Sequence, residues 1–235
     1  MYSLSQKLLA EFIGTFAVIF LAAGAICADE YVRVAGQYGA GLLGTALAYG
    51  LAVAIMVSAV GHISGGHLNP AVTIACWVTR RIGTLQGIGY AAAQLLGGLV
   101  ACYCLRVILP ESAWRPVSLG APDLGSDFTR MHGMELEALL TFFVVLVAFA
   151  SLIDPRGAFR RVAGLAVGFT VTAGYLAGAP FTGAAMNPVR AFGPALALHP
   201  HHWQNHGVYW VGPLFGGMFA GIVYDRLFLR NQPPA

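Results

Sequence analysis

The chain contains two glycine-rich segments that each end in Asn-Pro. They cover residues 62–73 and 180–190, and each lies between long apolar runs. Asn is a preferred N-cap residue and Pro is favoured at the first helical position, so Asn69 and Asn187, each followed by Pro, predict the start of a helix. Two such polar loops in apolar surroundings indicate a pore that both loops build.

The helices that follow these loops are too short to cross a membrane. Apolar residues continue from 71 to 79 and from 189 to 198, whereas a full span takes about 20 residues. We therefore expect half-helices. A half-helix that begins in mid-membrane directs a partial positive charge into the membrane interior. The irregular backbone before it is tolerated there only where it is buried in protein or lines a water-filled cavity.

Composition indicates an integral membrane protein. Of the 235 residues, 57% are hydrophobic and only 10% are charged, against about 25% charged in a soluble domain. The net charge of +3 is small and does not suggest a nucleic-acid partner. The cysteines lack metal-ligand spacing, and we interpret them as unpaired packing residues. They are Cys27, Cys76, Cys102 and Cys104.

Six apolar runs are long enough for full spans, and the half-helices follow the second and the fifth. The spans are residues 8–28, 41–60, 83–109, 134–153, 162–179 and 208–229. The connection 110–133 is rich in Pro, Gly, Asp and Ser, which predicts a surface loop. No separate soluble domain fits, so we expect a single transmembrane channel domain over residues 1–235.

The two halves, about 1–109 and 133–230, repeat one pattern. Glu11-x-x-x-Thr15-Phe16 matches Glu137-x-x-x-Thr141-Phe142, and Leu95-Leu96-Gly97-Gly98 matches Leu214-Phe215-Gly216-Gly217. Each half holds three spans, an odd number, so the second copy enters the membrane from the opposite side. The two half-helices then enter from opposite faces, and their positive N-termini meet near the middle.

Basic residues are unevenly shared between the two sides of the membrane. The side that holds both termini carries Lys7, Arg80, Arg81, Arg156, Arg160, Arg161, Arg226 and Arg230; the other carries Arg33, Arg106, Arg115 and Arg130. The positive-inside rule therefore places both termini in the cytoplasm. We expect a multi-pass protein of the plasma (cell inner) membrane.

Two glutamates lie within the predicted spans at repeat-related positions. Ionisable groups inside a membrane are functional candidates by default, so Glu11 and Glu137 are open to interpretation as a proton relay. Their repeat relation favours a second interpretation, in which each carboxylate accepts backbone N–H bonds from a half-helix loop. His67, in the first loop, either supports that loop or lines the cytoplasmic vestibule.

Three segments in order carry a resemblance to a known family. They are Ala10-Glu11-Phe12-x-Gly14-Thr15-Phe16, Ser64-Gly65-Gly66-His67-x-Asn69-Pro70-Ala71-Val72-Thr73, and Asn187-Pro188-x-Arg190-x-Phe192-Gly193-Pro194. With six spans and an internal repeat, the chain resembles the aquaporin (major intrinsic protein) family, in its water-selective branch. The resemblance implies an all-α membrane protein with six transmembrane helices and two re-entrant half-helices. It also implies a homotetramer with one pore per subunit, and no cofactor.

In this family four positions form a selectivity constriction. The resemblance places them at Tyr49, Tyr175, Ala184 and Arg190. Arg190 follows the family pattern as a fixed positive charge, whereas water-selective members usually have Phe and His at the first two positions. Two phenols keep the ring narrow and offer hydroxyls that donate or accept. We expect them to admit water and to obstruct a bulkier polyol.

Other positions bear on selectivity and on the second loop. Glycerol-conducting relatives tend to carry an acidic residue where Ala191 stands and to replace the aromatic pair Tyr209-Trp210, so both positions favour water. Val189 departs from the Asn-Pro-Ala of the family. Its extra bulk would cost about 1–3 kcal/mol unless neighbouring residues make room, so we expect a local readjustment around a retained pore.

These features favour a passive water channel whose half-helix dipoles and Arg190 oppose protons and cations. A facilitator of glycerol, ammonia, hydrogen peroxide or carbon dioxide is the alternative within the same class. A coupled transporter also uses inverted repeats but needs an ion site near the midplane. A closed, adhesive or junctional protein would not need the two Asn residues and Arg190. We expect no enzyme, since no nucleophile–base pair or metal cluster is apparent.

A histidine-rich segment lies near the end of the chain. It runs over residues 199–206, and imidazoles titrate near neutral pH, so a metal site or a pH gate is one interpretation. A polar loop at the extracellular rim is the simpler one.

Overall fold

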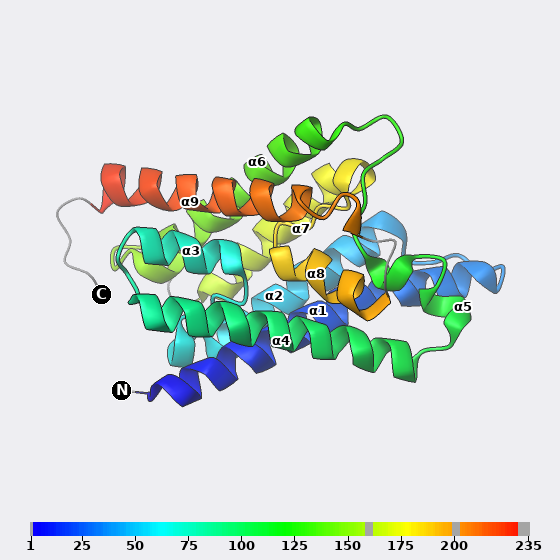
Figure 1. Ribbon diagram of the computed structural model, residues 1–235, viewed down its shortest axis with the longest axis horizontal. Helices are drawn as coiled ribbons and strands as arrows, with labels where there is room; N and C mark the ends of the chain where they lie inside the picture. Colours follow the sequence, from blue (N-terminus) through cyan, green and yellow to red (C-terminus); the bar gives the residue numbers. More distant parts are fainter. Residues whose placement is uncertain (1, 158–161, 199–202, 230–235) are drawn as a thin grey trace.

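The computed structural model describes residues 2–157, 162–198 and 203–229, which form helices and no strand. Six long helices and two interior short ones make up most of this part (Figure 1). The long helices are α1 (Leu4–Val34), α2 (Gly41–Ser64), α4 (Thr84–Ile108), α6 (Arg130–Ala148), α7 (Ala163–Thr182) and α9 (Val208–Phe228). The short ones are α3 (Pro70–Val78) and α8 (Pro188–Leu198), and a π-helical turn, η2 (Phe149–Ile153), extends α6.

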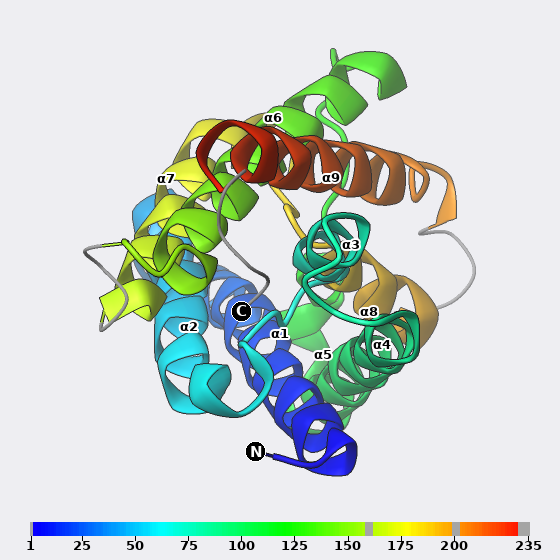
Figure 2. The same ribbon diagram turned by 90° about the vertical axis from the view of Figure 1, so that its left-hand side faces the viewer.

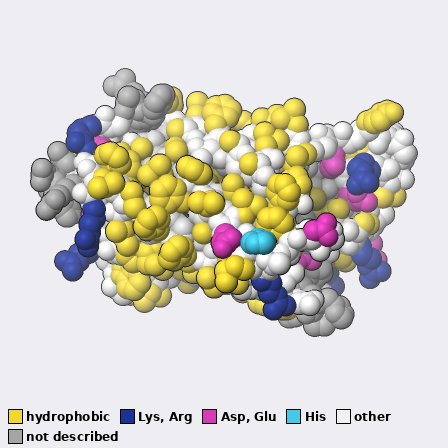
Figure 3. Space-filling model, turned by 90° about the horizontal axis from the view of Figure 1, so that it is seen from above, with side chains coloured by type: hydrophobic (Ala, Val, Ile, Leu, Met, Phe, Trp, Pro, Cys, Tyr) yellow, Lys and Arg dark blue, Asp and Glu magenta, His cyan; other side chains and the backbone are white. Residues whose placement is uncertain are grey.

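The long helices correspond to the six predicted spans. By length and apolar composition, α1, α2, α4, α6 with η2, and α7 can each cross a membrane. Helix α9 has 21 residues, enough for a span, but its four glycines, Pro213 and the pair Asp225-Arg226 make it less apolar. Figure 3 shows one face of the molecule, with hydrophobic side chains over its middle and Lys and Arg at its ends.

The two halves form the predicted inverted repeat. Helix α1 begins and α9 ends at the same end of the molecule, here named the proximal end; α3 lies in that half and α8 in the other (Figure 1). In the end-on view of Figure 2, α3 and α8 lie between α4 and α9. Helix α4 crosses α1 as α9 crosses α6. A Cβ on Gly97 would lie 2.5 Å from the Phe12 carbonyl oxygen, and one on Gly216 would lie 2.0 Å from that of Ala138.

The connection 110–133 differs from the surface loop that its composition predicts. It contains α5 (Glu111–Trp114) and a 3-10 turn, η1 (Ser118–Gly120), and both pack against α1. The side chains of Trp114 and Leu119 are buried. The prediction was therefore wrong for this stretch, because these apolar side chains fold the connection back onto the helices.

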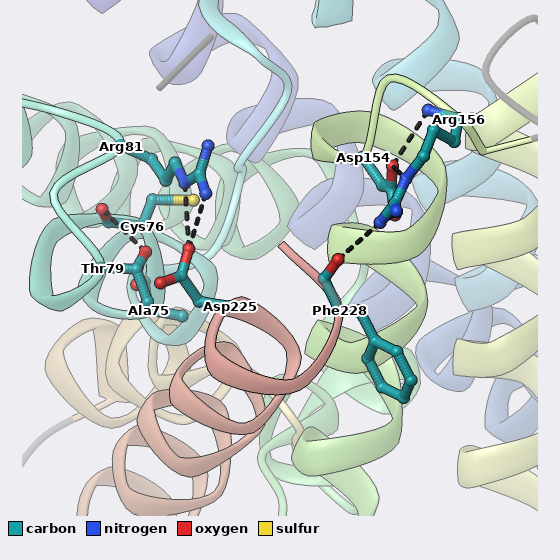
Figure 4. A network of polar contacts seen from close by, with 8 residues as sticks. All are labelled: Ala75, Cys76, Thr79, Arg81, Asp154, Arg156, Asp225 and Phe228. Atoms are coloured by element: carbon teal, nitrogen blue, oxygen red, sulfur yellow. Dashed lines mark hydrogen bonds and ion pairs between the residues drawn. The ribbon is translucent and has the colours of Figure 1, made fainter. Parts of the chain in front are cut away.

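Two ion pairs hold the proximal end of α9 (Figure 4). Arg81, which follows α3, lies 2.7 Å from the carboxylate of Asp225. Arg156 pairs with Asp154 at 2.9 Å and also donates to the Phe228 carbonyl oxygen at 2.6 Å. The hydrogen bonds from Arg156 hold the pKa of the Asp154 carboxyl well below its usual range. These contacts tie the ends of α3 and α6 to the last turn of α9.

Candidate functional site

The loop before α3 is held by the carboxylate of Glu11 on α1. One oxygen, Oε1, accepts from the Ser64 hydroxyl at 2.6 Å and from the His67 backbone N–H at 3.0 Å. The other, Oε2, accepts from the Leu68 N–H at 2.7 Å. Glu11 is fully buried. Its carboxylate satisfies donors of an irregular backbone that could not otherwise be buried at low cost.

The loop before α8 is held in the same way by Glu137 on α6. Its Oε1 accepts from the Thr182 hydroxyl and from the Ala185 N–H, both at 2.8 Å, and its Oε2 accepts from the Met186 N–H at 2.8 Å. Glu137 is also fully buried. Both predicted loop-support carboxylates thus lie against their loops, and each is occupied as an acceptor by neighbouring backbone groups.

Asn69 and Asn187 begin the two half-helices and lie back to back. The Oδ1 atom of Asn69 accepts from the Ala71 N–H at 2.8 Å, and that of Asn187 accepts from the Val189 N–H at 3.0 Å. Their Nδ2 groups cross to the opposite loops: Asn69 donates to the Met186 carbonyl at 2.8 Å. Asn187 donates to the Leu68 carbonyl at 3.0 Å. Each amide therefore caps its own helix and anchors the other loop.

Val189 is fully buried beside Asn187, and the room for it comes from Gly98 on α4. A Cβ on Gly98 would lie only 2.1 Å from Val189 Cγ1. Gly98, which has no side chain, therefore leaves the space that the bulkier Val189 occupies. At the repeat-related crossing, Gly217 faces the smaller Ala71, whose carbonyl oxygen would lie 2.7 Å from an added Cβ.

A narrow cavity adjoins the two Asn residues. Its wall is mostly apolar, with valines from α1, α2, α3, α6 and α7. The polar residues on it are Tyr49, His67, Asn69 and Asn187. His67 both lines this cavity and approaches the Thr73 hydroxyl, with 3.1 Å between Nδ1 and Oγ1. A mostly apolar wall with a few polar groups suits a path for small molecules.

The four residues assigned to the constriction are buried. The rings of Tyr49 and Tyr175 meet edge to face with centroids 5.9 Å apart. The Tyr49 hydroxyl donates to the Ala185 carbonyl oxygen at 2.9 Å, which ties this ring to the second loop. Ala184 belongs to the same loop, and its φ of 41° places it in the left-handed region.

Arg190, on the first turn of α8, is held by the connection 110–133. Its Nη1 donates to the Gly120 carbonyl oxygen. Its Nε has no partner among the described residues. The buried guanidinium therefore has one N–H donor that no described residue satisfies. Sequence reasoning missed Gly120, because a backbone carbonyl in an irregular connection leaves no side-chain signal.

Sequence reasoning also missed a polar network around the first loop. Gln94 on α4 donates to Glu11 Oε2 at 2.7 Å and to the Thr73 hydroxyl at 2.9 Å. Tyr90 donates to the Ser64 carbonyl at 2.6 Å. A buried glutamine in an apolar span was the signal that could have revealed the network, since buried polar groups are nearly always hydrogen-bonded.

The histidine-rich segment is described only in part, because His199, His201 and His202 lie outside the described residues. His206 is buried; its Nε2 accepts from Trp210 Nε1 at 2.9 Å, and its ring lies 4.5 Å from that of Trp203. Burial lowers the pKa of His206. This histidine therefore packs within an aromatic cluster in its neutral form.

Comparison with known proteins agrees with this architecture. Residues 1–224 match the family described as Major intrinsic protein. The chain is 44% identical over 227 residues to "Aquaporin TIP4-4" of Zea mays, covering 96% of this chain and 88% of the relative. It is 43% identical over 235 residues to "Probable aquaporin TIP3-2" of Arabidopsis thaliana, covering 96% and 85%.

A solved structure shares the fold. The aquaglyceroporin from Plasmodium falciparum superposes with a TM-score of 0.85, at 22% identity, over 97% of this chain and 98% of that one. Six long helices, two half-helices that meet at Asn-Pro, and relatives that are all named aquaporins lead to one conclusion. The chain belongs to the major intrinsic protein (aquaporin) family and is a multi-pass membrane channel for small solutes, not an enzyme.

Proposed function

We propose that this chain is a passive water channel with a single-file pore that excludes protons and ions. The observation that carries the proposal is the pairing of Asn69 and Asn187 beside an apolar cavity. Each Nδ2 has two hydrogens, and the bond to the opposite loop uses one of them. The second hydrogen of each amide is left to donate to a passing water, while the apolar wall offers that water few other partners.

Proton and cation exclusion follows from the same arrangement. The N-termini of α3 and α8 point at one another through their Asn caps, so two partial positive charges face the permeating file. Arg190 adds a full positive charge at the constriction. A water oriented by the two amides directs its oxygen towards both, which interrupts the hydrogen-bonded chain that a proton would need.

Selectivity is assigned to Tyr49, Tyr175, Ala184 and Arg190. The edge-to-face tyrosine pair and the bond from Tyr49 to Ala185 favour a narrow, fixed aperture. Such an aperture suits water better than a polyol. The alternative is a facilitator of glycerol, ammonia, hydrogen peroxide or carbon dioxide. The tyrosines, which depart from the residues usual in water-selective members, are the feature in its favour.

Assembly and location complete the proposal. We propose one channel domain over residues 1–235, a homotetramer with a pore in each subunit, no cofactor, and cytoplasmic termini. The plasma (cell inner) membrane is the proposed site, and the vacuolar membrane, to which the plant TIP relatives point, is the alternative. Fractionation of host membranes with an epitope-tagged chain distinguishes the two.

Stopped-flow light scattering on proteoliposomes tests which solute permeates the channel. A sucrose step should produce fast shrinkage, and a glycerol step should give no fast re-swelling. Tyr49→Ala removes one side of the aperture and should admit glycerol, whereas the matched variant Tyr103→Ala changes a tyrosine on the exposed surface of α4 and should behave as the parent. Fast glycerol re-swelling of the parent would favour the alternative solutes. Absence of fast shrinkage would contradict an open water channel.

A further inference from the structure

An apolar groove opens on the outer surface between α4 and α9, and α3 forms its floor. The floor carries Ile74 and Trp77, and Ile88 and Leu214 contribute from the two flanking helices. Since α4 spans the membrane and α3 lies within it, this groove faces the hydrocarbon of the bilayer.

The groove exists because the two repeats differ at this place. Helix α4 presents the small residues Thr84, Gly87 and Ala91 along it. The repeat-related positions before and at the start of α9 carry Trp203, His206 and Trp210. There, the rings of Trp203 and His206 lie 4.5 Å apart, and Phe192 of α8 meets Trp210 at 6.2 Å. Trp210 also lines the groove itself, so the difference lies in the other two positions: the rings of Trp203 and His206 stand in the second half where the first half has Thr84 and Gly87.

A polar, basic hollow adjoins the groove at the proximal end. It is lined by Arg80, Arg81 and Gln86, and it shares Trp77 and Thr84 with the groove. Trp77 Nε1 donates to the Thr84 hydroxyl at 3.1 Å at this junction. Arg81 is engaged with Asp225, whereas Arg80 is exposed and takes part in none of the ion pairs formed by the described residues. A cationic group therefore stands where the apolar groove reaches the membrane interface.

We propose that the groove and the hollow together bind one anionic phospholipid. Its phosphate lies at Arg80, and one acyl chain runs along α3 between α4 and α9. The apolar groove selects a hydrocarbon chain, and the basic hollow selects a net negative headgroup, so both parts are satisfied by a single lipid. A free phosphate ion would leave the groove open, and a zwitterionic lipid would lack the net charge.

The floor of this site is the back of the half-helix that carries Asn69. Thr73 lines the groove, and its hydroxyl is bonded to Gln94 and close to His67. A lipid chain in the groove therefore packs against the element that positions one pore amide. We expect the bound lipid to raise the thermal unfolding midpoint.

Native mass spectrometry of the purified protein tests the site. The protein is titrated with phosphatidylglycerol and with phosphatidylcholine of the same acyl chains. Phosphatidylglycerol should bind about fivefold more tightly, the factor expected from one interfacial arginine. Arg80→Gln should remove this preference. Arg226→Gln, which neutralises an exposed arginine on the last turn of α9, should retain it.

Variants that fill the groove test whether an acyl chain occupies it. Ala91→Trp introduces the residue that stands at the repeat-related position and should weaken binding of both lipids severalfold. Thr84→Trp should also weaken binding of both lipids, and because Thr84 is exposed, the new ring disturbs the packing of the helices less. Equal binding of the two lipids by the parent, or an unchanged preference in Arg80→Gln, would overturn the proposal. So would loss of the oligomer peak with unchanged lipid binding in the groove variants, since the groove would then be a subunit contact.

Discussion

The two half-helix loops share their backbone support but differ in their surroundings. In each, a buried glutamate from a long helix accepts a hydroxyl and two backbone N–H groups, and an Asn caps the short helix. The first loop is also held by a side-chain network through Gln94 and Tyr90, and the second by the Tyr49 hydroxyl, which donates to the Ala185 carbonyl. The second loop carries Ala184 and leads into Arg190. The common part satisfies the buried irregular backbone of both loops. The different parts are the polar network beside the first loop and the proposed constriction residues beside the second.

The helix crossings behind the loops show a similar division. Gly98 makes room for a side chain, Val189, whereas Gly217 makes room for a backbone carbonyl, that of Ala71. A side chain can be shortened by mutation, and a carbonyl cannot. The two halves should therefore respond differently to the same substitution, although their folds are related by the repeat.

The largest effect is expected for Gly217→Ala. The new Cβ would lie 2.7 Å from the Ala71 carbonyl oxygen, so the helices must separate, at a cost of about 3 kcal/mol. Gly98→Ala should cost about 1–3 kcal/mol through its clash with Val189. Thermal unfolding in detergent measures both.

Rescue variants sharpen this contrast. Val189→Ala combined with Gly98→Ala should recover most of the lost stability, because it removes the Cγ atom that clashes. Ala71→Gly combined with Gly217→Ala should not, because the carbonyl stays in place. Equal rescue in the two halves would mean that the crossings are looser than their geometry indicates.

The next effect concerns the two loop carboxylates. Glu137→Gln replaces one acceptor oxygen with an NH₂ group that faces a backbone N–H, at a cost of about 1–3 kcal/mol. Glu11→Gln should be milder, because Gln94 Oε1 has no partner among the described residues and Gln94 can turn to accept from the new amide. Thermal unfolding of the two variants shows which substitution costs more stability.

A proton-flux assay on the same variants distinguishes a loop-supporting role of the two glutamates from a proton-relay role. Proteoliposomes of the parent, loaded with a pH-sensitive dye, should pass no protons, and neither variant should change this. A proton flux in the parent that disappears in Glu11→Gln would contradict the supporting role.

The sequence was sufficient to predict the architecture, because its signals are local and repeated. Asn69 and Asn187, each followed by Pro, indicated two helix starts, and the short runs after them indicated half-helices. Apolar length predicted the six long helices to within a few residues at most ends. The repeat, with three spans in each half, predicted the inverted arrangement.

What the sequence did not reveal depends on contacts between distant segments. The bond from Arg190 to Gly120 uses a backbone carbonyl, which any residue supplies. The accommodation of Val189 depends on which glycine of α4 faces it, and the buried side of the connection 110–133 depends on where α1 passes. The roles given to the constriction residues stay predictions until permeation is measured.

A smaller effect distinguishes two repeat-related tyrosines. The Tyr90 hydroxyl donates to the Ser64 carbonyl, whereas the Tyr209 hydroxyl is buried with no partner among the described residues. Tyr90→Phe should cost about 1 kcal/mol, and Tyr209→Phe should be neutral or slightly stabilising. Chemical denaturation in mixed micelles measures the difference. Equal losses would mean that Tyr209 finds a partner in a water or lipid headgroup.

The smallest effect is a pH dependence confined to the second half, where His206 stands in place of Gly87. Burial lowers the pKa of His206 from its ordinary value of 6.5, so the unfolded chain takes up a proton at a higher pH than the folded one. The stabilisation that this site contributes is therefore complete above about pH 6.5 and falls as the pH drops towards the lowered pKa.

The experiment compares the thermal unfolding midpoints of the parent and of His206→Gln, whose amide oxygen can still accept from Trp210 but does not titrate. The parent should lose more of its thermal midpoint between pH 8 and pH 5 than the variant, while contributions from the other histidines cancel. If the thermal midpoint of the parent instead falls less than that of the variant at low pH, His206 is charged in the folded protein. That result would require an acidic partner rather than the aromatic cluster around it.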